Sequence, residues 1–484
     1  MRGKGGSKLA SCGRLSTILF FIAASIASFG QASAQTLPTT LVLAYQNNPQ
    51  LNAQRAQVRV TDEAVPQALS GYRPRLSVTA SAAQQFSSTD QLQTSPTPGN
   101  PTRQMIIVNP AITTSGDFTS KSVGVTGTQT LFNGFQTANR TRLAEGQVSA
   151  AREALRVLEQ AVLLAAATVY MDMLRDTAIV DVQRSNVRVL EETLRQTRDR
   201  FNVGEVTRTD VAQAEAQLAA GQFQLLTADS NLTTTRANFR RVIGIDPGRL
   251  TPAAPVDRLA PSTLAGALAV GLQQNPNVTA AMYGIDVANL QVKVNEGALF
   301  PTLTLNGAAQ RIWNGTVTQV EQTTWSVGTQ MTVPIYQGGG EYSLIRQSKE
   351  SLTQQRLDLE QVRDQTRATI AQAWGVVEAT KAQIESAQAQ VRSSETALNG
   401  VREEARVGQR TTLDVLNAQQ VLVNARVTLV TAQHDRVVAS YALLNAVGFL
   451  EPTKLGLKTP LYDPRIHYHQ IRDSWLGLRT PDGK

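Results

Sequence analysis

The residues whose spacing could support chemistry are two Thr-x-x-Asp pairs, Thr207 with Asp210 and Thr411 with Asp414. In this spacing the hydroxyl and the carboxylate each satisfy a free backbone amide at the start of a helix, an arrangement called a capping box. The spacing alone therefore favours a structural role for both carboxylates.

Motifs typical of enzymes and cofactor sites are absent from the sequence: it has no nucleophile elbow, no HExxH and no zinc-spaced cysteines. The glycine run 338–340 is not followed by the Lys-Ser/Thr of a phosphate loop. His467 and His469 would share one face of a strand, but a third ligand is not nearby and the only other histidine is His434. We expect no enzymatic activity, no cofactor and no metal site, and interpret these histidines as packing residues of a C-terminal tail.

The two Thr-x-x-Asp pairs belong to an internal repeat, because the stretch 200–218 recurs at 405–422 when the chain is shifted by 204 positions. In each copy a glycine, which tolerates the left-handed conformation, ends one helix before the capping box starts the next. Each copy therefore predicts the tip of a helical hairpin. The shift aligns Val203 with Val407, Gly204 with Gly408, Thr207 with Thr411 and Asp210 with Asp414.

The elements that position these tips are two long helical hairpins, expected over 133–244 and 337–448. Each incoming segment runs for about 70 residues without proline, which as a helix would reach roughly 100 Å. Charged residues scattered along these helices are expected to face solvent. The repeat divides the chain into a first half, 35–244, a Pro-rich linker, 245–262, a second half, 263–448, and the tail, 449–484.

Each half also begins with two helical segments and contains one pair of strands. Segments around 39–48 and 268–275 end at Asn-Pro, and amphipathic helices follow at 50–71 and 277–299. Strand pairs are expected within 76–131 and 302–335, where apolar and small polar residues alternate, with a polar loop at 88–117. The predicted strands are Leu76 to about Phe86, Lys121–Leu131, Leu303–Trp313 and Thr324–Ile335.

These strands have the 10 to 12 residues typical of tilted membrane strands, with more apolar residues on one face than on the other. Taken alone, the pattern fits a water-soluble hairpin equally well. If the strands lie in lipid, four strands leave two edges whose unpaired backbone groups cost more than a domain's stability, so an oligomer must close the sheet.

Residues 1–34 have the basic, apolar and small-residue regions of a signal peptide, with cleavage expected after Ala34. Its removal takes four positive charges from the formal +8, leaving +4, and removes Cys12, the one cysteine. Without a contiguous basic stripe, nucleic-acid binding is not indicated. No later segment is expected to form a membrane helix, because the best, Ala161–Met171, stops at Asp172.

The repeat, the proline-led strands, the F-N-G and Y-Q-G entries to the long helices and the V-G-x-x-T-x-x-D-V tips resemble the TolC family of outer-membrane efflux proteins. The resemblance covers essentially Thr36 to Gly448. It implies a mainly α fold with a transmembrane β part. It further implies a homotrimer whose 12-stranded outer-membrane β-barrel takes four strands from each chain and continues as a long periplasmic α-helical coiled-coil barrel.

The resemblance also implies roles for the hairpin tips. Asp414 matches an aspartate that rings the pore entrance, while Asn417 stands where well-studied members have a second aspartate. Arg410 matches a basic residue that ties the second hairpin to the first, with Thr209 and Asp210 as its partners. Ala405 replaces the tyrosine of that lock. The residues implied as adaptor contacts are Val203, Gly204, Val407 and Gly408.

From these features we predict an exit duct in the outer membrane, extending into the periplasm and surrounded by outer-membrane lipids. It would passively conduct drugs or other small toxic compounds from an inner-membrane transporter and a periplasmic adaptor. Two alternatives stay open: an outer-membrane component of type I protein secretion, and a periplasmic coiled-coil adaptor without a pore.

Overall fold

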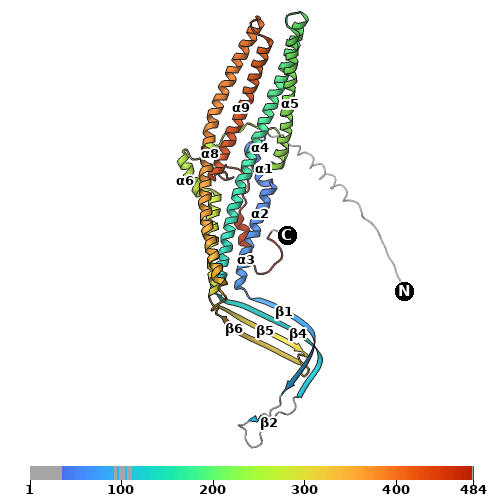
Figure 1. Ribbon diagram of the computed structural model, residues 1–484, viewed down its shortest axis with the longest axis vertical. Helices are drawn as coiled ribbons and strands as arrows, with labels where there is room; N and C mark the ends of the chain where they lie inside the picture. Colours follow the sequence, from blue (N-terminus) through green and yellow to red (C-terminus); the bar gives the residue numbers. More distant parts are fainter. Residues whose placement is uncertain (1–34, 92–94, 97–103, 106–111, 482, 484) are drawn as a thin grey trace, which may run out of the picture.

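The computed structural model describes residues 35–91, 95–96, 104–105, 112–481 and 483. The predicted signal peptide and Cys12 lie outside the described residues. Long helices run along an elongated body, and a sheet leaves one end of it at an angle (Figure 1). Both hairpin tips lie at the end of the body opposite the sheet.

The two hairpins are equal in length. The first consists of α4 (Gln136–Asn202) and α5 (Arg208–Ile243), and the second of α8 (Gly340–Arg406) and α9 (Thr412–Val447). Each incoming helix has 67 residues and each returning helix has 36. The described helices of the two hairpins therefore bring both tips to the same end of the body, about 100 Å from where the long helices begin.

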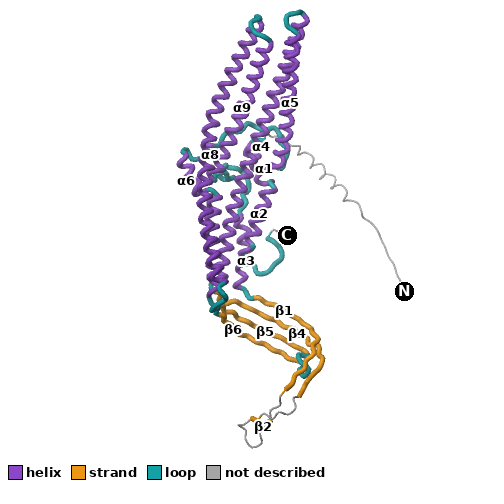
Figure 2. Tube along the Cα trace, viewed as in Figure 1, coloured by secondary structure: helices purple, strands orange, loops and turns teal. Residues whose placement is uncertain are grey.

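Shorter helices pack beside the sheet-proximal part of the hairpins (Figure 2). Asn48 and Asn275 connect these shorter helices to the hairpins in equivalent ways. The side-chain oxygen of each caps the helix that follows it. The side-chain amide of each donates to the end of a returning helix, Asn48 to Val242 O at 3.1 Å and Asn275 to Ala446 O at 2.8 Å. These elements are α1 (Leu37–Asn47), α2 (Pro49–Asp62), α3 (Ala64–Leu69), η1 (Ser70–Tyr72), η2 (Asp257–Leu259), α6 (Leu264–Gln274), α7 (Pro276–Glu296) and η3 (Gly297–Leu299).

The main sheet contains β1 (Arg75–Gln91), β4 (Ile112–Asn133), β5 (Thr302–Trp313) and β6 (Glu321–Thr332), all antiparallel and in that spatial order. The short β2 (Ser95–Pro96) and β3 (Gln104–Met105) pair with each other.

The predicted boundaries of three strands were wrong. Residues 88–91 and 112–117, expected in a loop, extend β1 and β4 because their Ser and Thr residues continue the ladder, and Thr113 Oγ1 donates to Asp90 Oδ1 at 2.6 Å. The last strand ends at Thr332, before Pro334, because proline has no amide to donate.

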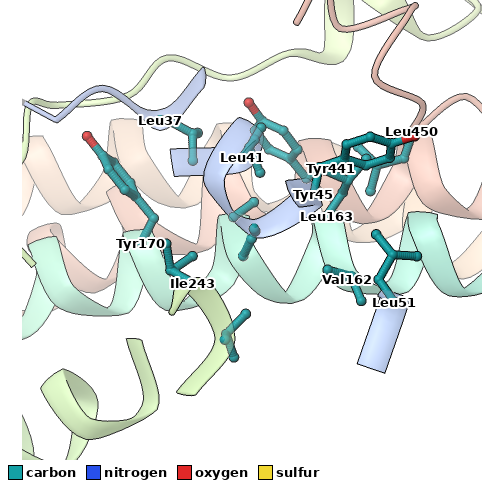
Figure 3. Close-up of a cluster of buried hydrophobic side chains, with 14 of the residues drawn as sticks. Leu37, Leu41, Tyr45, Leu51, Val162, Leu163, Tyr170, Ile243, Tyr441 and Leu450 are labelled. Atoms are coloured by element: carbon teal, nitrogen blue, oxygen red, sulfur yellow. The ribbon is translucent and has the colours of Figure 1, made fainter. Parts of the chain in front are cut away.

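The main core lies in the middle of the body, where α1 packs against α4 with the ends of α5 and α9 (Figure 3). Tyr170 is fully buried there, and its hydroxyl lies 2.9 Å from Gln35 O and 2.6 Å from Thr251 O. The core residues labelled in Figure 3 are Leu37, Leu41, Tyr45, Leu51, Val162, Leu163, Tyr170, Ile243, Tyr441 and Leu450.

Contrary to expectation, α4 contains a stretch that is apolar and long enough to cross a membrane by composition alone. Leu163, Ala166, Ala167 and Tyr170 of α4 are buried in the core just described. Packing against other helices accounts for their apolar character, so the stretch is weak evidence for a membrane helix.

The tail forms α10 (Pro464–Ile471), so the expectation that His467 and His469 share a strand face was wrong. In a helix, residues two apart point in different directions. His467 is buried and its Nδ1 lies 3.1 Å from Asp62 Oδ2, whereas His469 is exposed and stacks edge-on against Tyr468.

The glycines that end the two returning helices allow a matched test of the repeat. Gly244 and Gly448 have φ of +90° and +87°, but a Cβ at Gly448 would lie 2.9 Å from Asn275 Cα, whereas at Gly244 its nearest neighbour would be Asn47 Cβ at 3.5 Å. We expect Gly244→Ala to lower the free energy of unfolding by about 1–2 kcal/mol through backbone strain. Gly448→Ala should cost about 1–3 kcal/mol more through overpacking, measured by thermal unfolding in detergent. Equal losses would contradict the close approach at Gly448.

Candidate channel entrance and membrane-facing sheet

The register of the four strands separates apolar from polar side chains. Paired residues point to the same face of a sheet, so one face carries the larger apolar side chains and the other carries Ser, Thr, Asn and Gln. The apolar face includes Leu76, Val78, Val123, Val125, Leu305, Trp325, Val327 and Met331, and the polar face includes Ser77, Thr79, Ser81, Ser122, Thr126, Asn306, Gln310, Ser326 and Gln330.

Side-chain contacts support this assignment of faces. On the polar face, Ser77 Oγ lies 2.7 Å from Thr126 Oγ1 and Ser81 Oγ lies 2.8 Å from Ser122 Oγ. On the apolar face, Trp325 is 80% exposed, so a large aromatic ring stands uncovered in the single chain. A sheet with one exposed apolar face and one polar face suits a boundary between lipid and water.

The sheet in one chain is open at both sides. β1 and β6 are its edges, and each edge presents a row of backbone N–H and C=O groups with no strand beyond it among the described residues.

The length of the strands suits a membrane. The 12 residues of β5 extend about 40 Å, which at a tilt of about 45° crosses a hydrocarbon layer of about 25–30 Å.

At the far end of the body, both tips have the capping boxes that their spacing predicted. In the first, Thr207 N and Oγ1 donate to Asp210 Oδ2 at 2.9 and 2.7 Å, and Asp210 N donates back to Thr207 Oγ1 at 3.3 Å. In the second, Thr411 N and Oγ1 donate to Asp414 Oδ2 at 3.0 and 2.9 Å. These hydrogen bonds from threonine lower the pKa of both carboxyls, so both aspartates are charged at neutral pH.

The other tip residues lie on the exposed surface of the same turns. Gly204 and Gly408 have φ of +83° and +81°, and a Cβ on either would meet no atom within 4 Å. Val203, Val407, Thr209 and Asn417 are exposed. The tips are therefore free of intrachain packing and available to other molecules.

Arg410 pairs within its own hairpin in the single chain. Its Nε donates to Glu404 Oε2 at 2.9 Å, and this contact raises the pKa of the guanidinium further. Arg410 therefore has an intrachain partner other than Thr209 and Asp210, and its role in a lock between hairpins stays a prediction.

Between tips and core, the two hairpins touch through a small apolar cluster and a few polar contacts. Leu416 of α9 packs with Leu190, Leu194 and Ala214 of the first hairpin. Beside the cluster, Gln217 Nε2 donates to Gln420 Oε1 at 3.2 Å. An open groove of about 710 Å³, lined by residues of α4, α8 and α9, separates the hairpins closer to the tips.

Sequence reasoning missed a partly buried ionic cluster in the middle of the body, where all charges of the long helices were expected to be solvated. His434 of α9 lies between two carboxylates, with Nε2 2.9 Å from Asp172 of α4 and Nδ1 2.8 Å from Asp435. Arg175 contacts Asp172 and Asp176. No periodicity in the sequence could have paired His434 with Asp172, since these two residues come from separate halves.

A second ion pair joins α9 to the linker: Arg436, 8% exposed, donates to Asp257 of η2 at 2.5 Å. Nearby, Thr235 of α5 donates to the buried Asp176 at 2.6 Å. Within the described part of the chain, three or more His, Cys, Asp or Glu side chains do not gather with the geometry of a metal site. The cluster therefore holds helices together by charge.

Long helices that place exposed tips at one end and a two-faced sheet at the other define a protein whose strands lie in a membrane and whose helices project from it. A family model described as outer membrane efflux protein matches residues 40–245 and 269–449. The chain belongs to this family, which confirms the resemblance to TolC, and it is an outer-membrane efflux channel of the TolC type that extends into the periplasm.

Individual relatives support the assignment. The chain is 39% identical over 475 residues to the outer membrane efflux protein BepC of Brucella suis biovar 1, with 98% of each chain covered. It is 25% identical over 337 residues to the alkaline protease secretion protein AprF of Pseudomonas aeruginosa, covering 68% of this chain and 70% of AprF.

The solved CmeC outer membrane channel of Campylobacter jejuni shares the fold, with a TM-score of 0.72 at 18% identity and coverage of 90% of this chain and 89% of CmeC. These relatives are channel and export proteins.

The environment of His434 predicts a pH dependence. Burial lowers the pKa of its imidazole, but Asp172 and Asp435 together outweigh burial, so the pKa is raised overall. A raised pKa in the folded state contributes stability that is complete below the unfolded value near 6.5 and is lost as pH rises through the folded value. We expect the thermal midpoint to fall between about pH 6 and 9 more steeply in the wild type than in His434→Gln. If the thermal midpoint falls with pH equally steeply in both proteins, these carboxylates do not stabilise the protonated imidazole.

Proposed function

We propose that this chain is the exit duct of a tripartite efflux pump, assembled as a homotrimer and working with a periplasmic adaptor and an inner-membrane transporter. Drugs or other small toxic compounds pass through it passively. The observation that carries the proposal is the four-stranded sheet, whose apolar and polar faces and open edges suit a wall between lipid and a water-filled bore.

The open edges support an oligomer. In hydrocarbon each unpaired backbone group costs several kcal/mol. Alternate residues of an edge strand direct such groups to the strand's free side. β1 of one copy and β6 of the next would satisfy each other, and rotational symmetry then closes the sheet. Three copies with four strands each would give the 12-stranded barrel implied by the family.

The helices support passage across the periplasm. At about 1.5 Å per residue, the 67 residues of α4 and α8 extend roughly 100 Å from the sheet. The exposed turns at their ends, with Val203, Gly204, Val407 and Gly408, are the proposed adaptor contacts. The entrance of the duct would lie between these tips.

Asp414 suits a place at the entrance. Its Oδ2 accepts hydrogen bonds from Thr411 N and Thr411 Oγ1, and the side chain is only partly covered. One carboxylate can therefore cap the helix and present negative charge to the bore. Three copies around an axis would favour cations; Asn417, one turn further, adds no charge.

Export of polypeptides is the second candidate, supported by the similarity to AprF, whose name assigns it to alkaline protease secretion. The more extensive similarity to BepC, named as an efflux protein, favours small compounds. A deletion strain distinguishes them: hypersensitivity to drugs with an unchanged set of secreted proteins supports efflux. A periplasmic adaptor without a pore does not account for the two-faced sheet.

The direct test is conductance of the purified protein in planar lipid bilayers. A trimeric duct should insert and give discrete, cation-preferring single-channel currents. A protein that remains a water-soluble monomer and gives no current would overturn the proposal.

Asp414 and Asp210 form a matched pair for testing the entrance, because both cap a helix in the same way. We expect Asp414→Ala to reduce the preference for cations, since it removes a charge from the bore, and Asp210→Ala to leave ion selectivity near the wild type. Reversal potentials in a salt gradient measure both. Equal effects of the two substitutions would mean that loss of the cap, and not pore charge, is responsible.

The proposed lock can be separated from the intrachain ion pair of Arg410. Arg410→Ala removes both the contact to Glu404 and any link to Thr209 and Asp210 of the first hairpin, whereas Glu404→Gln removes only the ion pair. If Arg410 holds the entrance closed, Arg410→Ala should raise single-channel conductance several-fold while Glu404→Gln changes it little. Equal conductance in wild type and Arg410→Ala would exclude the lock.

A further inference from the structure

The C-terminal tail is held against the body by buried polar contacts. α10 packs on α2, where the carboxylate of Asp62 is fully buried and lies 3.1 Å from His467 Nδ1. Tyr468 contacts Glu145 of α4 at 3.3 Å, and Arg472 contacts the same carboxylate at 3.4 Å. The segment after α10 therefore leaves the body from a fixed point.

That segment is fixed a second time where the helical body meets the sheet. Arg73 donates to Ser474 O at 2.6 Å, and its guanidinium lies 4.7 Å from the centre of the Trp475 ring. Arg73 precedes the first residue of β1, Arg75, by two positions. Trp475 is therefore held at the level where the strands begin, and Figure 2 shows the tail beside α3 near the start of the sheet.

The residues that follow are apolar and uncovered. Trp475, Leu476 and Leu478 are 66%, 95% and 104% exposed. Arg479, which is also exposed, follows Leu478 directly in the tail, and Arg73 contacts the ring of Trp475. Adjacent exposed tryptophan and leucine with neighbouring arginine is typical of segments that lie in the interface of a membrane, where the aromatic ring sits at headgroup level and arginine meets lipid phosphate.

Charged groups of both signs lie around this segment. Glu145 is paired with Arg472, and Asp473 is exposed on the side of the tail that precedes Trp475. Glu63 lines the cleft beneath the loop together with Arg479. Arg73 adds positive charge from the body beside Trp475, so basic and acidic side chains both border the three apolar side chains.

We propose that Trp475, Leu476 and Leu478 insert into the periplasmic leaflet of the outer membrane, with Arg479 binding a lipid phosphate group. The inference rests on the proposed function, because it requires the sheet to lie in the membrane. The apolar side chains of the tail would contact the lipid surface, because the tail is held at the base of the membrane-facing sheet. The anchor would fix the depth of the duct on its periplasmic side.

Environment-sensitive fluorophores on single cysteines test this in the full-length trimer reconstituted into vesicles of phosphatidylethanolamine and phosphatidylglycerol. Cys12, the one native cysteine, lies in the predicted signal peptide. The labelled positions are Leu476→Cys, Trp325→Cys on the apolar face of β6, and Leu226→Cys on α5, whose side chain is 71% exposed. Lipids that carry a quencher at the headgroup, and aqueous iodide, report the surroundings of each label.

We expect lipid quenching at positions 476 and 325 to be several-fold stronger than at 226, and iodide to quench 226 most strongly. Lipid quenching at 325 without quenching at 476 would overturn the tail anchor and leave the proposed function standing. A label at 476 that neither lipid nor iodide reaches would show that a second copy covers the tail, which also overturns it. Absence of lipid quenching at 325 would overturn the placement of the sheet itself.

Discussion

Unpaired backbone groups at the two edges of the sheet constrain the rest of the architecture. Within one chain, β1 and β6 each have a free side, which hydrocarbon does not tolerate. In the proposed assembly, neighbouring copies supply the missing partners. Their helices would then surround a common axis, because every strand of the main sheet is connected at its body end to a helical element. The order of strands thus determines both how copies meet and where the helices stand around the bore.

The internal repeat makes this arrangement regular. α4 and α8 have equal lengths, as do α5 and α9, and the caps at Thr207 and Thr411 and the glycines at 244 and 448 keep the same offset. The two halves also differ in the sheet, where β1 and β4 continue beyond β5 and β6. Insertions are tolerated there because that end projects past the membrane, whereas a longer helix would displace one tip from the plane of the others.

Local patterns in the sequence were sufficient for the hairpins, the Asn-Pro junctions and the presence of four strands, because the capping boxes, the prolines and the alternation each depend on residues a few positions apart. The extension of β1 by Ser and Thr was missed because those residue types suit loops as well as ladders. Pairings between halves, such as His434 with Asp172 or His467 with Asp62, were missed because they depend on how helices are rotated against each other. Whether Asp414 lies near the axis of the proposed oligomer depends on other copies of the chain, so the contacts within one chain do not determine it.

The distribution of packing along the helices explains why the tip end is the part that can move. The middle of the body contains the large core around Tyr170 together with the ion pairs of His434 and Arg436, so separating the hairpins there would expose many apolar side chains and unpaired charges. Closer to the tips the described contacts between the hairpins are a small apolar cluster around Leu416 and the hydrogen bonds of Gln217 with Gln420 and of Gln419 with Asn186. Opening costs the least free energy where the fewest buried contacts are lost. A hinge motion that parts the tips while the core holds the other end is therefore the change this fold allows most readily, and it would occur at the end where the proposed entrance lies.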